Sequence, residues 1–167
     1  ADYMMTVGGG SSELKVKKEV SPIEGLRALY GEDKITYMKG YTQHEDEKVE
    51  SIDELKSAAA EADAVIYVGG LNKNRYQDCE DRDRREYGLP YGQDAVIEAL
   101  LEANPRTAIV ILSGNAVAMP WLDKASAIVE GWYLGSEAGN ALAGVLSGNV
   151  NPSGKLPYTI QPTLADY

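Results

Sequence analysis

The stretch Ala64-Val65-Ile66-Tyr67-Val68-Gly69-Gly70 decides the fold class of this chain. Its apolar run, closed by two glycines, predicts a buried strand over residues 64–68. A polar excursion from Leu71 to Pro90 follows and concentrates carboxylates and arginines just past the strand. In open α/β sheets, ligand sites collect at the carboxyl ends of the strands. A loop of this length inside a domain is either functional or disordered, and we interpret it as functional.

Helices and strands are predicted to alternate along the rest of the chain. Capping boxes at 21–24 and 51–54 predict two helix starts, and apolar periodicity gives helices over 22–30, 51–62, 92–103 and 136–146. Further strands are predicted over 34–38, 107–112 and 127–132, and a proline-containing piece over 156–160 is expected to form an antiparallel edge strand. This pattern predicts an α/β fold with a mainly parallel sheet and helices on both faces. No strand precedes the loop at residues 8–12, so the first strand of the domain is expected to be missing.

Composition limits the classes of partner. The chain has 167 residues, 44% of them hydrophobic, and a net charge of -10. One domain with a real core is expected, and the negative charge argues against nucleic acid and anionic membranes. No apolar run approaches the roughly 20 residues that span a bilayer. With Cys79 as the one cysteine no internal disulfide can form, which leaves the compartment open, with a periplasmic or secreted location slightly favoured over the cytoplasm.

Several other features have a plain structural interpretation. Cys79 has no histidine in a nucleophile pattern, and His44 lies in an acidic, exposed stretch rather than in a metal-ligand spacing. The glycines at 8–10 lack the Lys-Ser/Thr ending of a phosphate loop. We therefore expect no metal and no cofactor. Three aromatic residues could stack on sugars but are interpreted as core or interface residues: Trp121, Trp132 and Tyr133.

Four sets of residues, in order along the chain, together resemble one family. They are Gly8–Ser12 with Ser21–Leu26, Ala62–Gly69 with Glu80–Arg84 and Leu89–Gln93, Ala116–Trp121 with Ala127–Ala141, and Asn151–Pro157. The set is similar to the C-terminal α/β-sandwich domain of the family 3 glycoside hydrolases, the β-glucosidase and β-xylosidase group. The resemblance implies such a domain over residues 1–160, truncated at its N-terminus, with the start of a linker over 161–167.

The resemblance also implies a function that this chain shares with another domain. Retaining glycosidases use two carboxyl groups, a nucleophile and a general acid/base. The family's aspartate nucleophile lies in an N-terminal TIM-barrel domain, which nothing in this chain matches. The resemblance therefore implies that this domain supplies the acid/base of an exo-acting β-glycosidase, most simply a β-glucosidase acting on β-linked glucosides or oligosaccharides. The chain alone is expected to be inactive.

Glu80 matches the family's acid/base glutamate in the pattern Glu-Gly-x-Asp-Arg. Asp83 and Arg84 match the following pair and are interpreted as an ion pair that supports the loop. Asp81 stands where the family often has Gly; if the position needs a positive φ, Asp tolerates it better than most residues. A general acid needs a raised pKa. Neighbouring carboxylates at 78, 81 and 83 would raise the pKa of Glu80 and arginines at 82, 84 and 85 would lower it, and the sequence leaves that balance open.

Other residues of the site are expected around this glutamate. Arg75 and Tyr76, early in the long loop, are expected to line a leaving-group subsite. Ser11 and Ser12 are expected, by family analogy, to lie near the active-site mouth and touch substrate. Asp78 remains the alternative acid. A second hypothesis is a non-catalytic scaffold, a dimerisation domain, with a homodimer as partner, or a glycan-binding domain, in an enzyme whose acid/base lies elsewhere.

Overall fold

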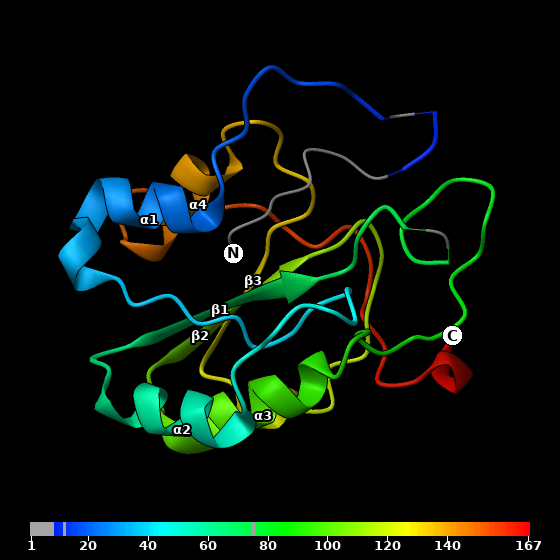
Figure 1. The fold of residues 1–167 in the computed structure, drawn as a ribbon. Helices are drawn as coiled ribbons and strands as arrows, with labels where there is room; N and C mark the ends of the chain where they lie inside the picture. Colours follow the sequence, from blue (N-terminus) through cyan, green and yellow to red (C-terminus); the bar gives the residue numbers. More distant parts are fainter. Residues whose placement is uncertain (1–8, 12, 75) are drawn as a thin grey trace.

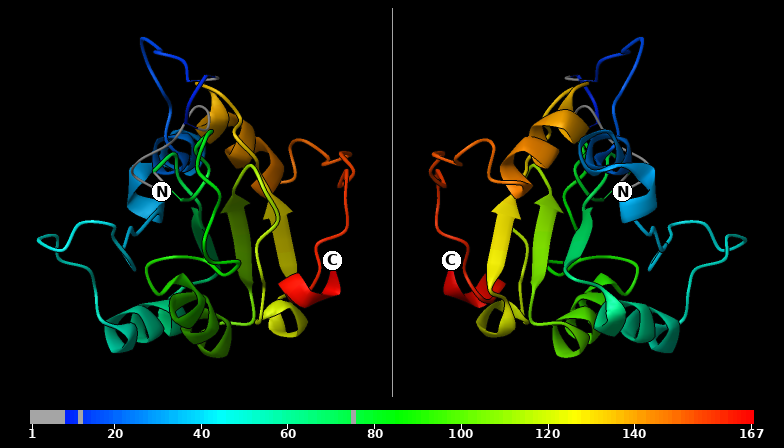
Figure 2. Two further views of the ribbon diagram at one scale, coloured as in Figure 1. Left: turned by 90° about the vertical axis from the view of Figure 1, so that its right-hand side faces the viewer. Right: turned by 90° about the vertical axis from the view of Figure 1, so that its left-hand side faces the viewer.

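A parallel sheet lies at the centre of the chain in the computed structural model, which describes residues 9–11, 13–74 and 76–167. Its strands are β1 (Val65–Gly70), β2 (Thr107–Leu112) and β3 (Ala127–Glu130), in the order β1-β2-β3. Helices α1 (Pro22–Tyr30) and α4 (Ala138–Leu146) lie on one side of the sheet, and α2 (Ile52–Glu61) and α3 (Gln93–Ala103) lie on the other (Figures 1 and 2). Short 3-10 helices occupy Glu32–Lys34, Leu122–Lys124 and Leu164–Asp166. The predicted α/β sandwich is confirmed.

Burial on both faces explains why the strands are apolar without interruption. Tyr67, Ile109 and Ile111 pack in the core that includes residues of α2 and α3. Val68 and Val110 point the other way and pack with Leu142 of α4. Successive strand residues face opposite sides of a sheet, so a sheet with helices on both faces needs apolar residues at every position.

Both predicted capping boxes are formed. The N–H of Ser21 donates to the carboxylate of Glu24 at 2.7 Å, and the N–H of Ser51 donates to that of Glu54 at 2.8 Å. In each box the serine Oγ in return accepts from the glutamate N–H, at 3.4 and 3.3 Å. These reciprocal bonds satisfy donors that a helix start leaves open, and they fix where α1 and α2 begin.

Two predicted strands are wrong. Lys34 ends a 3-10 helix, residues 35–38 form no strand, and the main chain of Lys39, just beyond them, bonds to Glu50 instead. Residues 156–160 form no antiparallel edge strand either. Pro157 has no N–H for a ladder, and the Thr159 carbonyl accepts from the Tyr167 hydroxyl at 3.2 Å. In both segments apolar residues alternate along the sequence, but neither segment pairs with a neighbouring strand.

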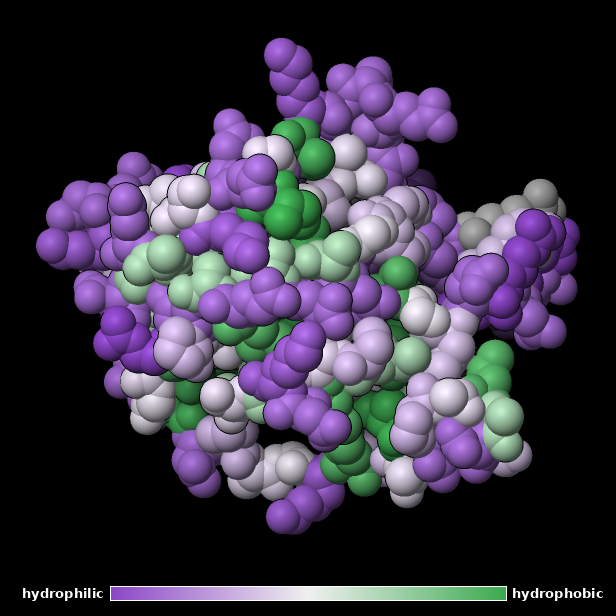
Figure 3. Space-filling view, turned by 90° about the horizontal axis from the view of Figure 1, so that it is seen from below, coloured by the Kyte–Doolittle hydropathy of each residue, from purple (hydrophilic) through white to green (hydrophobic). Residues whose placement is uncertain are grey.

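The surface over α2 and α3 is largely hydrophilic, with small hydrophobic areas between charged side chains (Figure 3). This matches the net charge of -10. Among the described residues, no helix has both the length and the apolar character needed to cross a membrane.

Candidate active site

A cleft of about 1020 Å³ opens at the carboxyl end of the sheet. It is lined by the loop after β1, by the segment after β2 and by Tyr133 after β3, and Tyr158 and Tyr167 of the C-terminal segment close another side. The carboxyl ends of parallel strands meet at one edge, which is where ligands bind in such sheets. The long loop therefore forms one wall of the cleft at the edge expected from the sequence.

Glu80 lies on this wall, against the glycine-rich segment. The N–H of Ser11 donates to Oε2 of Glu80 at 2.5 Å, and the N–H of Glu80 donates to the carbonyl of Gly9 at 3.2 Å. Gly10 has φ +94°, and a Cβ there would lie 2.8 Å from Oε2 of Glu80 and overlap its Cβ. Only glycine allows this approach and this backbone conformation together. The glycine-rich segment thus serves as a seat for Glu80.

The pKa of Glu80 is set mainly by hydrogen bonds, rather than by the neighbouring aspartates or arginines that the sequence suggested. Hydrogen bonding by Ser11, from its side chain and then its main chain, lowers the pKa of Glu80 from the ordinary value of 4.5. Burial of the carboxyl group opposes this shift but is the smaller effect. Hydrogen bonds to a carboxylate favour its charged form. In this chain alone, the ionised form of Glu80 is therefore favoured, whereas a general acid must carry a proton.

Asp81 has φ 68°, so the position where the family often has Gly does need the left-handed backbone conformation. Asp is one of the few residues that adopt it readily. Its carboxylate pairs with the guanidinium of Arg82 at 2.8 Å, and the Asp81 side chain is 86% exposed. The departure from the family pattern is thus accommodated within the same turn.

Asp83 and Arg84 do not form the expected ion pair among the described residues. Arg84 instead donates to the carbonyl of Ala116, beyond the end of β2, and its guanidinium lies 5.6 Å from the ring centroid of Tyr87. Planar guanidinium groups suit both contacts. Arg84 therefore connects the loop to the rest of the cleft, but through a carbonyl and an aromatic ring rather than through Asp83.

Asp78 lines the cleft but is only 9% exposed. Its Oδ1 accepts from Nδ2 of Asn115 at 3.0 Å, and its Oδ2 accepts from the N–H of Gly114 at 2.6 Å and from the hydroxyl of Tyr133. A general acid must reach the leaving oxygen, whereas both oxygens of Asp78 are already bonded within the protein. This geometry does not favour Asp78 as the alternative acid.

The expected substrate contacts are only partly described. Arg75 and Ser12 lie outside the described residues. Tyr76 has φ 68°, and the guanidinium of Arg85 lies 3.7 Å from its ring centroid. Neither residue is among those that line the cleft. Ser11 contacts Glu80. The roles of all four in substrate binding stay predictions.

The aromatic residues separate into two groups. Trp121 is fully buried and donates from Nε1 to Asp94 at 2.8 Å, so its interpretation as a core residue is confirmed. Trp132 packs edge-on against Tyr158, with ring centroids 5.8 Å apart. Tyr133 lines the cleft. In the described part of the chain no three His, Cys, Asp or Glu side chains gather as a metal site, and His44 is exposed.

Glu130 is a residue of this region that sequence reasoning missed. It ends β3, and burial raises its pKa from 4.5 to about 7. Its Oε1 accepts from the N–H of Trp132 at 3.2 Å and from Oγ of Ser113 at 3.4 Å. A carboxyl group at the end of a short apolar strand, at the ligand-binding edge of the sheet, was the available signal.

Fold and cleft together define an α/β domain with a glutamate presented at the strand ends. The sequence model of the glycosyl hydrolase family 3 C-terminal domain matches residues 1–167. A Beta-glucosidase BoGH3A of Bacteroides ovatus is 48% identical over 97% of this chain, and a Probable beta-glucosidase I of Emericella nidulans is 45% identical over 70%. The crystal structure of a Bifidobacterium adolescentis GH3 beta-glucosidase superimposes with a TM-score of 0.80 at 31% identity, over 94% of this chain and 23% of that one.

The chain belongs to glycoside hydrolase family 3, as its C-terminal domain. It spans 23% of the length of the Bacteroides ovatus relative and 14% of the Emericella nidulans relative. Those relatives therefore contain further domains besides the one described here.

Proposed function

We propose that this domain supplies the general acid/base of a retaining, exo-acting β-glucosidase. Glu80 would protonate the oxygen of the leaving group and then take a proton from the incoming water. An aspartate nucleophile from an N-terminal barrel domain of the same enzyme would attack the anomeric carbon. The substrates would be β-linked glucosides or oligosaccharides.

The observation that supports the proposal is the set of contacts that holds Glu80. A glutamate in the family's acid/base pattern lies at the cleft, bonded to Ser11 and packed on Gly10. A carboxylate that merely solvates a loop needs neither contact. The names of the relatives, which are beta-glucosidases, support the choice of reaction.

The lowered pKa of Glu80 requires a contribution from the complete active site. In retaining enzymes the two carboxyl groups lie about 5–5.5 Å apart, and a second negative charge at that distance raises the pKa of its neighbour. Removal of water by the barrel and the substrate acts in the same direction. The domain would position the acid, and the assembled enzyme would set its pKa.

Replacement of Glu80 in the full-length enzyme tests the proposal. In Glu80→Ala, kcat/KM for a β-glucoside with a poor leaving group such as cellobiose should fall about 10²–10⁴-fold, the usual contribution of general acid catalysis. A dinitrophenyl glucoside, which needs no protonation, should be cleaved at the first step nearly as before. Azide, which replaces water as the nucleophile, should restore part of the turnover of that substrate.

Glu45→Ala, which removes an exposed carboxylate outside the residues that line the cleft, is the control and should keep activity on both substrates. If Glu80→Ala hydrolyses cellobiose at the wild-type rate, the acid/base lies elsewhere and the domain is a scaffold or binding domain. In that case calorimetry of glucose or cellobiose binding would separate those two alternatives.

A further inference from the structure

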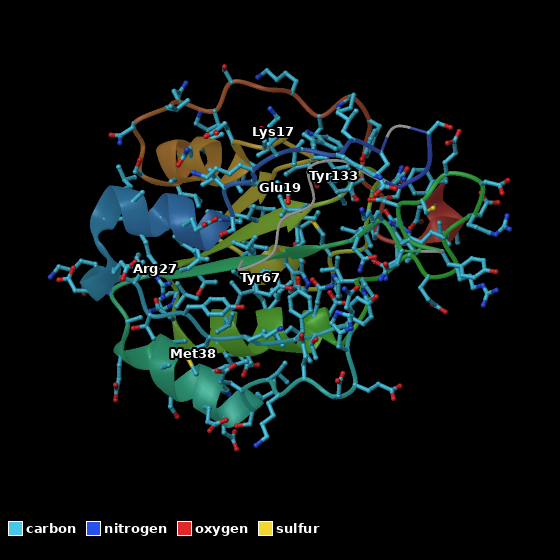
Figure 4. All side chains as sticks on the ribbon, turned by 45° about the horizontal axis from the view of Figure 1, so that its top comes forward. Lys17, Glu19, Arg27, Met38, Tyr67 and Tyr133 are labelled. Atoms are coloured by element: carbon cyan, nitrogen blue, oxygen red, sulfur yellow. The ribbon has the colours of Figure 1, made fainter. Side chains whose placement is uncertain are left out.

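Asp78 is the point at which the Glu80 loop is joined to the rest of the strand ends. β1 leads into Asp78, β2 leads into Gly114 and Asn115, and β3 leads into Tyr133. The carboxylate of Asp78 accepts from all three of those residues. The side chain of Asp78 thus connects the segments that follow the three strands. Tyr133, one of its partners, is labelled in Figure 4.

The main chain of Asp78 is engaged as completely as its side chain. Its N–H donates to the carbonyl of Asn72 at 2.9 Å, which closes the first part of the loop on itself. Its carbonyl accepts from the N–H of Gly9 at 2.9 Å. The carbonyl of Gly9 in turn accepts from the N–H of Glu80. These two bonds of Gly9, to Asp78 and to Glu80, fix the peptide units on either side of Cys79.

These contacts lie only two residues from Glu80. The side chain of Glu80 is exposed, and its described contacts are the N–H of Ser11 and the backbone at Gly10. Its position therefore depends strongly on the backbone that carries it. We propose that Asp78 is a positioning residue for the acid/base: its carboxylate holds the loop to the ends of β2 and β3 and thereby sets where Glu80 presents its proton. This inference rests on the proposed function of Glu80.

A substitution at Tyr133 can distinguish a positioning role of Asp78 from a role in folding alone. Burial, and then the hydrogen bond to Asp78, raise the pKa of Tyr133, so its hydroxyl keeps the proton that it donates. Tyr133→Phe removes that single oxygen and leaves the ring and the Asp78 charge in place. Asp78→Ala removes all three acceptor contacts.

The test measures kcat/KM of the full-length enzyme on cellobiose and on a dinitrophenyl glucoside. A displaced acid can cost about 10²-fold when a geometric error reaches roughly 1 Å. Asp78→Ala should therefore lose about 10- to 100-fold on cellobiose and much less on the dinitrophenyl substrate, with KM for cellobiose little changed. Tyr133→Phe should show the same leaving-group dependence at smaller size, even if Asp78→Ala fails to fold.

Asp123→Ala and Tyr30→Phe are matched controls, since both residues are exposed and lie outside the residues that line the cleft. The proposal is overturned if Tyr133→Phe and any folded Asp78→Ala lose both substrates equally, or lose neither, while Glu80→Ala behaves as an acid/base variant. If Glu80→Ala itself shows no leaving-group dependence, the proposed function fails, and with it this inference.

Discussion

Glu130 combines a partly buried carboxyl group with a position close in sequence to Tyr133, which lines the cleft. Burial is the largest cause of its raised pKa of about 7, and the charge of Asp78 adds to it, whereas hydrogen bonds from Trp132 and Ser113 oppose it. The folded state therefore holds a proton on Glu130 at pH values where an unfolded chain does not. Because the folded state binds more protons between pH 4.5 and about 7, its stability falls as the pH rises through that interval and then levels off.

Glu130→Gln keeps the shape of the side chain and removes its charge. The free energy of unfolding of this variant, relative to wild type, should be higher at about pH 8 than at about pH 5, because only wild type has to carry a buried charge at the higher pH. Urea unfolding at the two pH values measures it. Glu45→Gln, in the exposed acidic stretch, should show no such trend. A difference that is the same at both pH values would contradict the assignment.

At the scale of elements, α1 and α4 cross at two glycines. A Cβ on Gly25 would overlap the carbonyl of Gly139, and a Cβ on Gly139 would overlap the carbonyl of Ser21. The N–H of Gly139 also donates to Val20 at 2.9 Å. Interior glycines weaken a helix by roughly 1 kcal/mol relative to alanine, so the close approach explains why both helices keep them. This crossing holds the helix pair on its side of the sheet.

Gly139→Ala should destabilise the fold by about 1–3 kcal/mol, the usual cost of overpacking, despite its better helix propensity. Gly144→Ala in the same helix is the control. Its Cβ would meet the side chain of Val150, with Cγ2 at 3.2 Å and Cβ at 3.9 Å, and that side chain is exposed and able to move. Thermal unfolding of the two variants compares them. If Gly139→Ala were as stable as Gly144→Ala, the crossing would not depend on glycine.

At the scale of the whole molecule, the carboxylate proposed as the acid/base lacks, in this chain, the surroundings that a general acid needs. Glu80 lies at the surface and its pKa is lowered by Ser11. Under the proposed function, the domain supplies one of two catalytic carboxyl groups, and the pKa of that group depends on what covers the cleft.

A carboxyl carbon NMR titration of this chain should accordingly give Glu80 a pKa below 4.5. In the full-length enzyme, the alkaline limb of kcat/KM should report a clearly higher value, because a second carboxylate and loss of water both disfavour the charged form. A Glu80 pKa already raised in this chain would show that the domain tunes its own acid.

Much of the fold was predictable because its causes are local in sequence. The capping boxes at Ser21 and Ser51, the apolar runs of β1 and β2 and the loop after β1 can all be recognised from a few neighbouring residues. The role expected of Glu80, as the acid/base, came from the resemblance to the family pattern. Even the tolerance of a positive φ at Asp81 follows from the residue type. The strands expected over 34–38 and 156–160 failed because a strand needs a partner, which local alternation cannot supply.

Contacts between distant segments were decided only by the tertiary structure. Gln93 opens α3 like an ordinary polar residue, yet it is fully buried and bonds the hydroxyl of Tyr67 and both main-chain groups of Gly70. Asp78 is likewise a candidate acid by sequence, yet in the structure its carboxylate is bonded to Gly114, Asn115 and Tyr133. By itself the sequence determined the family, the sheet and the loop that carries Glu80. Which groups surround that loop, and hence the pKa and orientation of its carboxylates, depends on distances that only folding sets.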